Sequence, residues 1–231
     1  MALHRFWQSI VLGVLLLGST TPGYAEDVEL CVPFQDSKVA PERVQAMLSA
    51  AEDGHLYRIQ PDTSRVGFCV DSKFSRVKAE FRIFQGGLSL WPDPGEDEQA
   101  MVIIRAASLD TNGSIVEHML KSQRFFDVKN YPEILFVSKS LHWTSPTMVE
   151  LEGDLTLHGV TKTVTFQVQL TSMEKEPDSQ VEKIEAKAGT TIKRSDFGMD
   201  ALSQLVDDSV ELCMSVEAIR HDAQRSSADD S

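Results

Sequence analysis

The chain has 231 residues, with 22 Lys and Arg against 35 Asp and Glu, so its formal net charge at pH 7 is −13. Nucleic acids and anionic membrane surfaces repel a protein of this charge, which excludes both as general partners. The length is sufficient for one large domain or two small ones.

The first 25 residues have the composition of a cleaved secretory signal peptide. A short start with one Arg precedes the apolar run 10–18, and the small residues Gly23 and Ala25 stand where a cleavage site requires them. Nine apolar residues fall well short of the roughly 20 that cross a bilayer, so a membrane anchor is disfavoured. We therefore expect export and removal of residues 1–25, with no stable membrane span afterwards.

An N-terminal extension, residues 26–56, follows the signal peptide. It is predicted to contain a short helix over 41–54, because Pro41 suits a first helical turn and Gly54 suits a helix end. Four apolar residues recur at helical spacing and form one face: Val44, Met47, Leu48 and Ala51. We expect this helix to pack on the outside of the main domain.

From Tyr57 onward, the hydrophobic pattern has a period of two, which is typical of half-buried β-strands. The alternating runs cover 64–70, 76–84, 99–107, 133–141, 147–157, 163–172, 182–193 and 209–219. About eight such strands predict an antiparallel sandwich or barrel. Because the charged face is dense with Lys and Glu, we expect the apolar face to point inward, as in a soluble barrel.

Two features interrupt this alternation. Phe81 and Phe84 differ in parity, and a β-bulge near Ile83 would place both inside. A helical stretch over about 114–123 lies within the insertion 110–132 and could roof one end of a barrel. Ile115, Met119 and Leu120 are predicted to share one side of that helix.

No local motif indicates catalysis or metal binding. The six histidines have no metal-ligand spacing, and the sequence contains no GxSxG, P-loop or GxGxxG motif. Arg194, Ser195 and Asp196 form a polar cluster after a strand. His158 could contact a ligand headgroup, but the favoured interpretation is a structural one, in which it braces a turn and Gly159 takes a positive φ.

The three cysteines are Cys31, Cys69 and Cys213. Export to an oxidising compartment would permit one disulfide and leave one thiol. By strand parity Cys69 and Cys213 point to the outer face, where they could pair directly. A bond involving Cys31 is slightly favoured, because it would hold the N-terminal extension.

Several separate motifs, in the same order, resemble the YceI-like family over about residues 57–219. They are GDLTLHGVTKTVTF (153–166), FFDVKNYPEILFVS (125–138), RSDFGM (194–199), the closing strand VELCMSVEA (210–218), and the opening segments SRVGFCV (64–70) and AEFRIFQGGL (79–88).

The resemblance implies an all-β fold: an extended, eight-stranded, antiparallel, lipocalin-like barrel over 57–221, with a helical insertion. The tail over 222–231 has no large hydrophobic residue and is predicted to be disordered from its composition. It also implies a periplasmic protein whose apolar tunnel holds a polyisoprenoid, an isoprenoid quinone or a similar long-chain lipid, without catalysis. The candidate tunnel residues are Phe68, Val70, Phe81, Phe84, Leu120, Phe126, Phe136, Leu155, Leu157, Phe166, Phe197 and Met214. The matched polar positions at the rim are His158, Arg194, Ser195 and Asp196.

Two alternatives stay open at this point. An eight-stranded barrel is just wide enough to be filled by side chains or to hold one small ligand, so a filled core acting as an envelope interaction module is the first. The second is a hydrolase of a hydrophobic substrate, which would need His158 close to Ser195 or Asp196. For the oligomeric state, the sequence is compatible with both a monomer and a homodimer.

Overall fold

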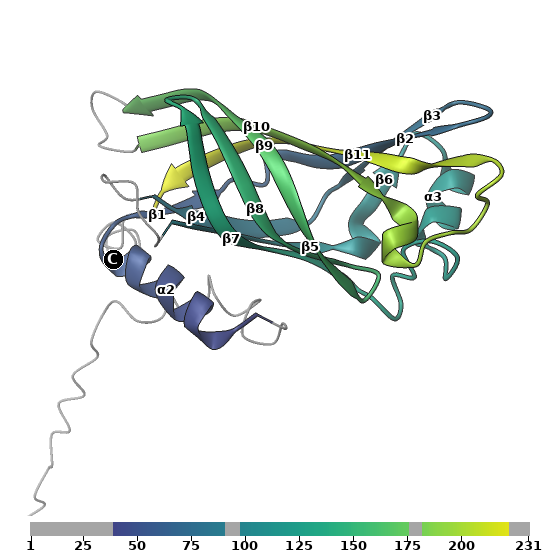
Figure 1. Ribbon diagram of the computed structural model, residues 1–231, viewed down its shortest axis with the longest axis horizontal. Helices are drawn as coiled ribbons and strands as arrows, with labels where there is room; N and C mark the ends of the chain where they lie inside the picture. The colour runs from purple at the N-terminus through teal and green to yellow at the C-terminus, as the bar shows by residue number, and fades with distance from the viewer. Residues whose placement is uncertain (1–38, 91–97, 176–181, 222–231) are drawn as a thin grey trace, which may run out of the picture.

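Antiparallel strands dominate the computed structural model, which describes residues 39–90, 98–175 and 182–221 (Figure 1). The predicted signal peptide, Cys31 and the predicted tail 222–231 lie outside the described residues. The strands are β1 (Leu56–Ile59), β2 (Arg65–Ser72), β3 (Arg76–Phe81), β4 (Phe84–Ser89), β5 (Gln99–Arg105), β6 (Leu109–Thr111), β7 (Glu133–Ser145), β8 (Met148–Leu157), β9 (Val160–Lys175), β10 (Glu182–Lys193) and β11 (Val206–Arg220). The helices are α2 (Pro41–Glu52) and α3 (Ser114–Lys121), with short 3₁₀ turns η1 (Ala106–Ser108) and η2 (Arg194–Phe197).

Eight of these strands close into a ring. Neighbours pair in the order β1-β4-β5-β7-β8-β9-β10-β11, and a further pairing between β1 and β11 closes the barrel. Strands β2, β3 and β6 continue from β11 as an additional antiparallel segment. The predicted eight-stranded antiparallel barrel is therefore confirmed.

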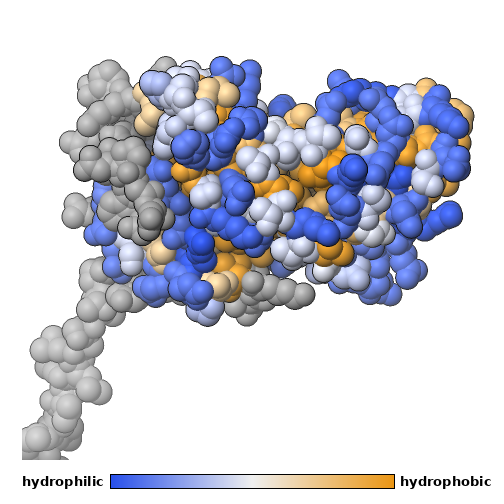
Figure 2. All heavy atoms as spheres, viewed as in Figure 1, coloured by the Kyte–Doolittle hydropathy of each residue, from blue (hydrophilic) through white to orange (hydrophobic). Residues whose placement is uncertain are grey.

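Alternation along each strand separates the core from the surface. On β8, Leu155 and Leu157 are buried inside the barrel, whereas Glu152 is exposed on the outer face. Because successive side chains of a strand point to opposite faces, an apolar residue at every second position is sufficient to make a continuous apolar interior. Hydrophilic residues predominate near the two ends of the face shown in Figure 2, and hydrophobic ones show between them along the barrel.

Helix α2 packs on the outside of the barrel, as predicted. Its buried residues Val44, Met47 and Ala51 form a second hydrophobic cluster with outward-facing residues of the barrel strands, namely Leu56, Met101, Ile103 and Leu135. Gly54 follows the helix with φ +72°, a left-handed conformation that favours glycine. Among the described residues, no helix is both long and apolar enough to cross a membrane.

Two local predictions are wrong. The chain does not bulge at Ile83: strand β3 ends at Phe81, a new strand begins at Phe84, and the bend between them leaves Ile83 exposed. Phe81 and Phe84 are nevertheless both buried in the core, as expected. Helix α3 spans Ser114–Lys121 as expected, but Ile115 is 85% exposed. Val116 takes the inward place, because with Met119 and Leu120 it forms the i, i+3, i+4 face that meets the barrel interior.

Candidate functional site

The barrel encloses an elongated cavity of about 240 Å³. A cavity needs only roughly 10–15 Å³ on this measure to admit one water molecule, so the interior is hollow and not filled by side chains. Among the described residues that line it, all are apolar or glycine except Arg194. Such a surface offers hydrophobic contact to a ligand and almost no hydrogen bonds.

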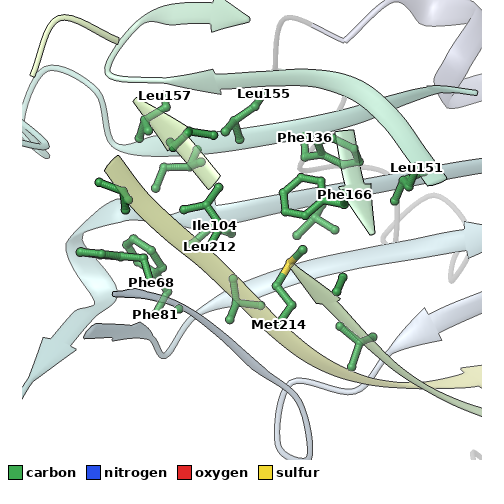
Figure 3. A pocket seen from close by; sticks show the side chains of 18 of the residues that line it. Phe68, Phe81, Ile104, Phe136, Leu151, Leu155, Leu157, Phe166, Leu212 and Met214 are labelled. Atoms are coloured by element: carbon green, nitrogen blue, oxygen red, sulfur yellow. The ribbon is translucent and has the colours of Figure 1, made fainter. Parts of the chain in front are cut away.

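Side chains from most of the strands converge on this cavity. Phe136 of β7 and Phe166 of β9 meet edge to face with ring centroids 5.3 Å apart, and Leu151 and Met214 lie near them (Figure 3). A second aromatic group joins Phe68 to Phe126 at 5.5 Å and Phe81 to Phe126 at 5.8 Å. These offset and edge contacts are the favoured geometries for aromatic pairs, so they fix the shape of the wall.

The insertion after β6 closes one end of the barrel. Residues Val116, Met119 and Leu120 of α3, followed by Phe125 and Phe126, all line the cavity. Figure 1 shows α3 and η2 at the same end of the barrel, away from α2. The expectation that this insertion roofs the barrel is confirmed.

The cavity runs along most of the barrel. Ile134 and Trp143 both line it and are nine positions apart on β7. At a rise of about 3.3 Å per residue, these two positions are separated by about 30 Å. The shape is therefore that of a long, narrow tunnel, which suits a chain and not a compact ligand.

The structure places all of the predicted tunnel residues in the core, and all of them line the cavity except Phe84 and Phe197. Phe84 is 3% exposed at the start of β4, and Phe197 is 1% exposed within η2. Both belong to the buried hydrophobic core, but neither is a lining residue of the cavity. Contact between the remaining residues and a ligand stays a prediction.

His158 braces a turn, in agreement with the structural interpretation. His158 and Gly159 connect β8 to β9, and both have positive φ, 51° and 74°, as a two-residue type I′ turn requires. The His158 Nδ1 donates to the Phe197 carbonyl oxygen at 3.0 Å, and its ring meets Tyr131 edge to face. A Cβ at Gly159 would lie 2.4 Å from the Tyr131 ring, so glycine alone fits there.

Arg194 is buried and holds the segment between η2 and β11. Its guanidinium donates hydrogen bonds to four backbone carbonyls, those of Met199, Ala201, Val206 and Asp207. Because carbonyl oxygens occupy both sides of the guanidinium fork, this cation is committed to the protein backbone. The Arg194 head is therefore not a free anion-binding group.

Ser195 and Asp196, unlike Arg194, do not line the cavity. The Asp208 carboxylate accepts a hydrogen bond from the Ser195 hydroxyl at 2.7 Å and another from its backbone N–H at 2.9 Å. These two bonds lower the pKa of Asp208 below its usual range. Asp196 is exposed. The hydrolase hypothesis required His158 to act with one of these residues, but His158 and Ser195 are hydrogen-bonded to other groups.

Glu98 and Trp143 form a buried polar pair that was not among the predicted site residues. Glu98 is 5% exposed directly before β5, and its Oε2 accepts a hydrogen bond from the Trp143 indole N–H at 3.2 Å. Burial raises the pKa of Glu98, and the bond from Trp143 partly opposes that rise. The available signal was a carboxylate at the same parity as the alternate residues Ala100, Val102 and Ile104, which line the cavity.

Two of the three cysteines, Cys69 and Cys213, lie in the described part of the chain. Cys69 of β2 lies opposite Glu211, and Cys213 of β11 lies opposite Gly67, so the two are diagonal neighbours on the outer face. Both are free thiols. Within the described ranges, no group of three or more His, Cys, Asp or Glu residues is arranged to hold a metal ion.

The fold and the cavity together define a lipocalin-like barrel with a hollow apolar interior. Residues 57–218 match the YceI-like domain. A UPF0312 protein of Pseudomonas putida strain F1 is 35% identical over 150 residues, which cover 64% of this chain and 76% of that protein. The chain belongs to the YceI-like family.

Solved structures share this architecture. A YceI protein of Campylobacter jejuni is 27% identical, with a TM-score of 0.60 over 64% of this chain and 87% of that one. BcnA of Burkholderia cenocepacia is 21% identical, with a TM-score of 0.61 over 69% and 98% of the two chains. A polyisoprenoid-binding domain from Saccharophagus degradans is 16% identical, with a TM-score of 0.56 over 71% and 98%. The last two likenesses concern the fold alone.

Proposed function

We propose that this protein is a periplasmic binding or carrier protein for a polyisoprenoid or a similar long-chain lipid, such as an isoprenoid quinone, and that it performs no catalysis. The hollow, apolar tunnel carries the proposal. Each buried CH₂ group of a ligand contributes roughly 0.8 kcal/mol, so a long chain can bind with few polar contacts. The polyisoprenoid-binding domain of Saccharophagus degradans has a similar fold, which supports the proposed ligand class.

Binding without catalysis is supported by the polar residues near the tunnel. His158 and Ser195 take part in turn-stabilising hydrogen bonds, and neither residue lines the cavity. A filled-core interaction module is disfavoured, because a cavity of about 240 Å³ leaves apolar walls without contact partners.

Native mass spectrometry and organic extraction of the protein, purified from the periplasm of a Gram-negative host, test the lipid hypothesis. We expect a stoichiometric long-chain lipid in the native mass, and its release on extraction. A clean apo mass, together with no uptake of offered isoprenoid quinones, would contradict the hypothesis and favour the interaction module.

Cell fractionation tests the proposed location. We expect the chain to appear in the periplasmic fraction with an N-terminus at Glu26, because residues 1–25 have the pattern of a signal peptide. Recovery of an uncleaved chain from the cytoplasm would contradict export.

Export would also expose the thiols to an oxidising compartment, so we predict one disulfide, with Cys31 as the favoured participant and Cys69–Cys213 as the alternative. Non-reducing peptide mapping of periplasmic protein distinguishes the three possible pairings, Cys31–Cys69, Cys31–Cys213 and Cys69–Cys213. Three alkylatable thiols in that sample would show the prediction to be wrong.

A further inference from the structure

Glu98 is a buried carboxylate directly before β5, at the margin of the tunnel. It precedes Ala100 by two residues, and Ala100 and Val102 line the cavity. Glu98 is not itself a lining residue of the cavity, but its hydrogen-bond partner Trp143 is. Only 5% of the residue is exposed.

The Glu98 carboxylate has acceptor capacity to spare. An ionised carboxylate offers about four lone-pair positions, and Trp143 is its one hydrogen-bond partner among the described residues. Trp143 itself lines the cavity and comes from a different strand, β7. The pair therefore forms a polar point at the margin of an otherwise apolar tunnel.

The two ends of the tunnel carry different charged groups, a carboxylate at one end and a guanidinium at the other. Glu98 and Trp143 lie near the end of β7 that is distant from α3, about 30 Å along the strand from Ile134. Arg194 lies beside the α3 end and gives all of its hydrogen bonds to backbone carbonyls. Among the described lining residues, no other cation faces the cavity.

We propose that Glu98 is the headgroup acceptor of this tunnel and that it selects a neutral, hydroxyl-bearing long-chain lipid over the phosphate ester of the same chain. This inference rests on the proposed lipid-binding function. A hydroxyl or phenol can donate to the carboxylate, because the bond from Trp143 fills only one of its acceptor positions. A phosphate would place like charge beside the carboxylate, where burial weakens solvent screening, and the net charge of −13 adds to the repulsion.

Three probes with one hydrocarbon chain test the inference: geranylgeraniol, its methyl ether and geranylgeranyl phosphate. Affinities are measured by displacement of a fluorescent long-chain probe from the full mature protein at about pH 8, well above the ordinary pKa range of a carboxyl. We expect the alcohol to bind about tenfold more tightly than the ether, since only the alcohol donates, and at least about tenfold more tightly than the phosphate.

Glu98→Gln removes the charge and keeps the size of the side chain. We expect this variant to bind the phosphate and the alcohol within about threefold of each other, because the repulsion is gone. Glu152→Gln, on the outer face of β8, removes one charge far from the tunnel interior and should keep the wild-type order. Thermal unfolding of each variant checks that it is folded.

Trp143→Phe removes the indole donor and keeps the Glu98 charge. It therefore tests the inference even if Glu98→Gln does not fold. It should retain the discrimination against the phosphate. Equal wild-type affinity for all three probes, or a preference for the phosphate, would overturn the headgroup inference and leave lipid binding intact. Binding of none of the three would instead overturn the proposed lipid-binding function.

Discussion

Single polar side chains hold the turns that close this barrel. Asp208 accepts two hydrogen bonds from Ser195, Arg194 donates to four carbonyls, and His158 donates to Phe197. None of these residues needs a ligand to explain its position. At the residue scale, the polar motifs shared with the family are therefore explained by fold stability.

The lowered pKa of Asp208 leads to a pH-dependent prediction. A carboxyl whose pKa is depressed by folding stabilises the folded state above its ordinary value of 3.8, and this stability is lost as the pH falls through the folded-state value. We expect Asp208→Asn to cost about 1 kcal/mol or less at pH 7, because the residue is exposed. Urea unfolding of both proteins from pH 7 downward should show this difference vanishing well below pH 3.8. A constant difference would contradict the assignment.

Arg194→Lys is predicted to be strongly destabilising even though the substitution retains the positive charge. An ammonium group cannot reproduce the planar fork that serves four carbonyls, so buried acceptors would lose their donors. We expect a loss of about 2–4 kcal/mol in the free energy of unfolding, measured by chemical denaturation. The control is Arg65→Lys, whose exposed ion pair with Glu80 should contribute less than about 1 kcal/mol.

At the scale of elements, two helical segments serve different surfaces. Helix α3 presents Val116, Met119 and Leu120 to the interior and closes the tunnel. Helix α2 instead covers outward-facing apolar residues of the barrel, such as Met101 and Ile103. An outer barrel surface would ordinarily be polar, so this apolar patch explains why the extension before the domain is an integral part of the fold.

Met47→Asp tests the attachment of α2. Met47 is 3% exposed in the cluster beneath the helix, so a buried charge there should cost about 3 kcal/mol or more. Gln45→Asp, on the exposed side of the same helix, should be nearly neutral. Thermal unfolding measures both. Because α2 lies outside the tunnel, lipid uptake by folded Met47→Asp should equal that of the wild type, and a selective loss of uptake would show a role for α2 in binding.

At the scale of the whole molecule, the barrel is closed around an unfilled tunnel. Filling that tunnel should therefore reduce lipid binding without lowering the stability of the fold. Val168→Trp adds bulk at an inward position that lines the cavity. We expect at least a tenfold loss of lipid uptake with little change in the unfolding temperature, because the added ring occupies existing space. Thr165→Trp, on the exposed face of the same strand, is the control. Unchanged uptake by folded Val168→Trp would contradict the tunnel as the lipid site.

The period-two pattern and the ordered motifs were sufficient to predict an antiparallel barrel with an inward apolar face. They also predicted helix α2, its burial, and the roof formed after β6. Local rules succeed here because side chains two apart on a strand share a face, whatever the rest of the chain does. They failed at Ile83 and Ile115, where the path of the chain between elements decides which residue turns inward.

Local patterns in the sequence were enough to predict the class of fold, the apolar character of the interior and the structural role of the turn at His158. The hollow interior required the three-dimensional structure, because cavity volume depends on how strands from the whole chain are spaced around it. The tertiary structure also decided that Arg194 is committed to the backbone and that Glu98 meets Trp143 across the barrel wall, 45 residues apart in the chain. Such contacts join distant segments, and no local spacing in the sequence encodes them.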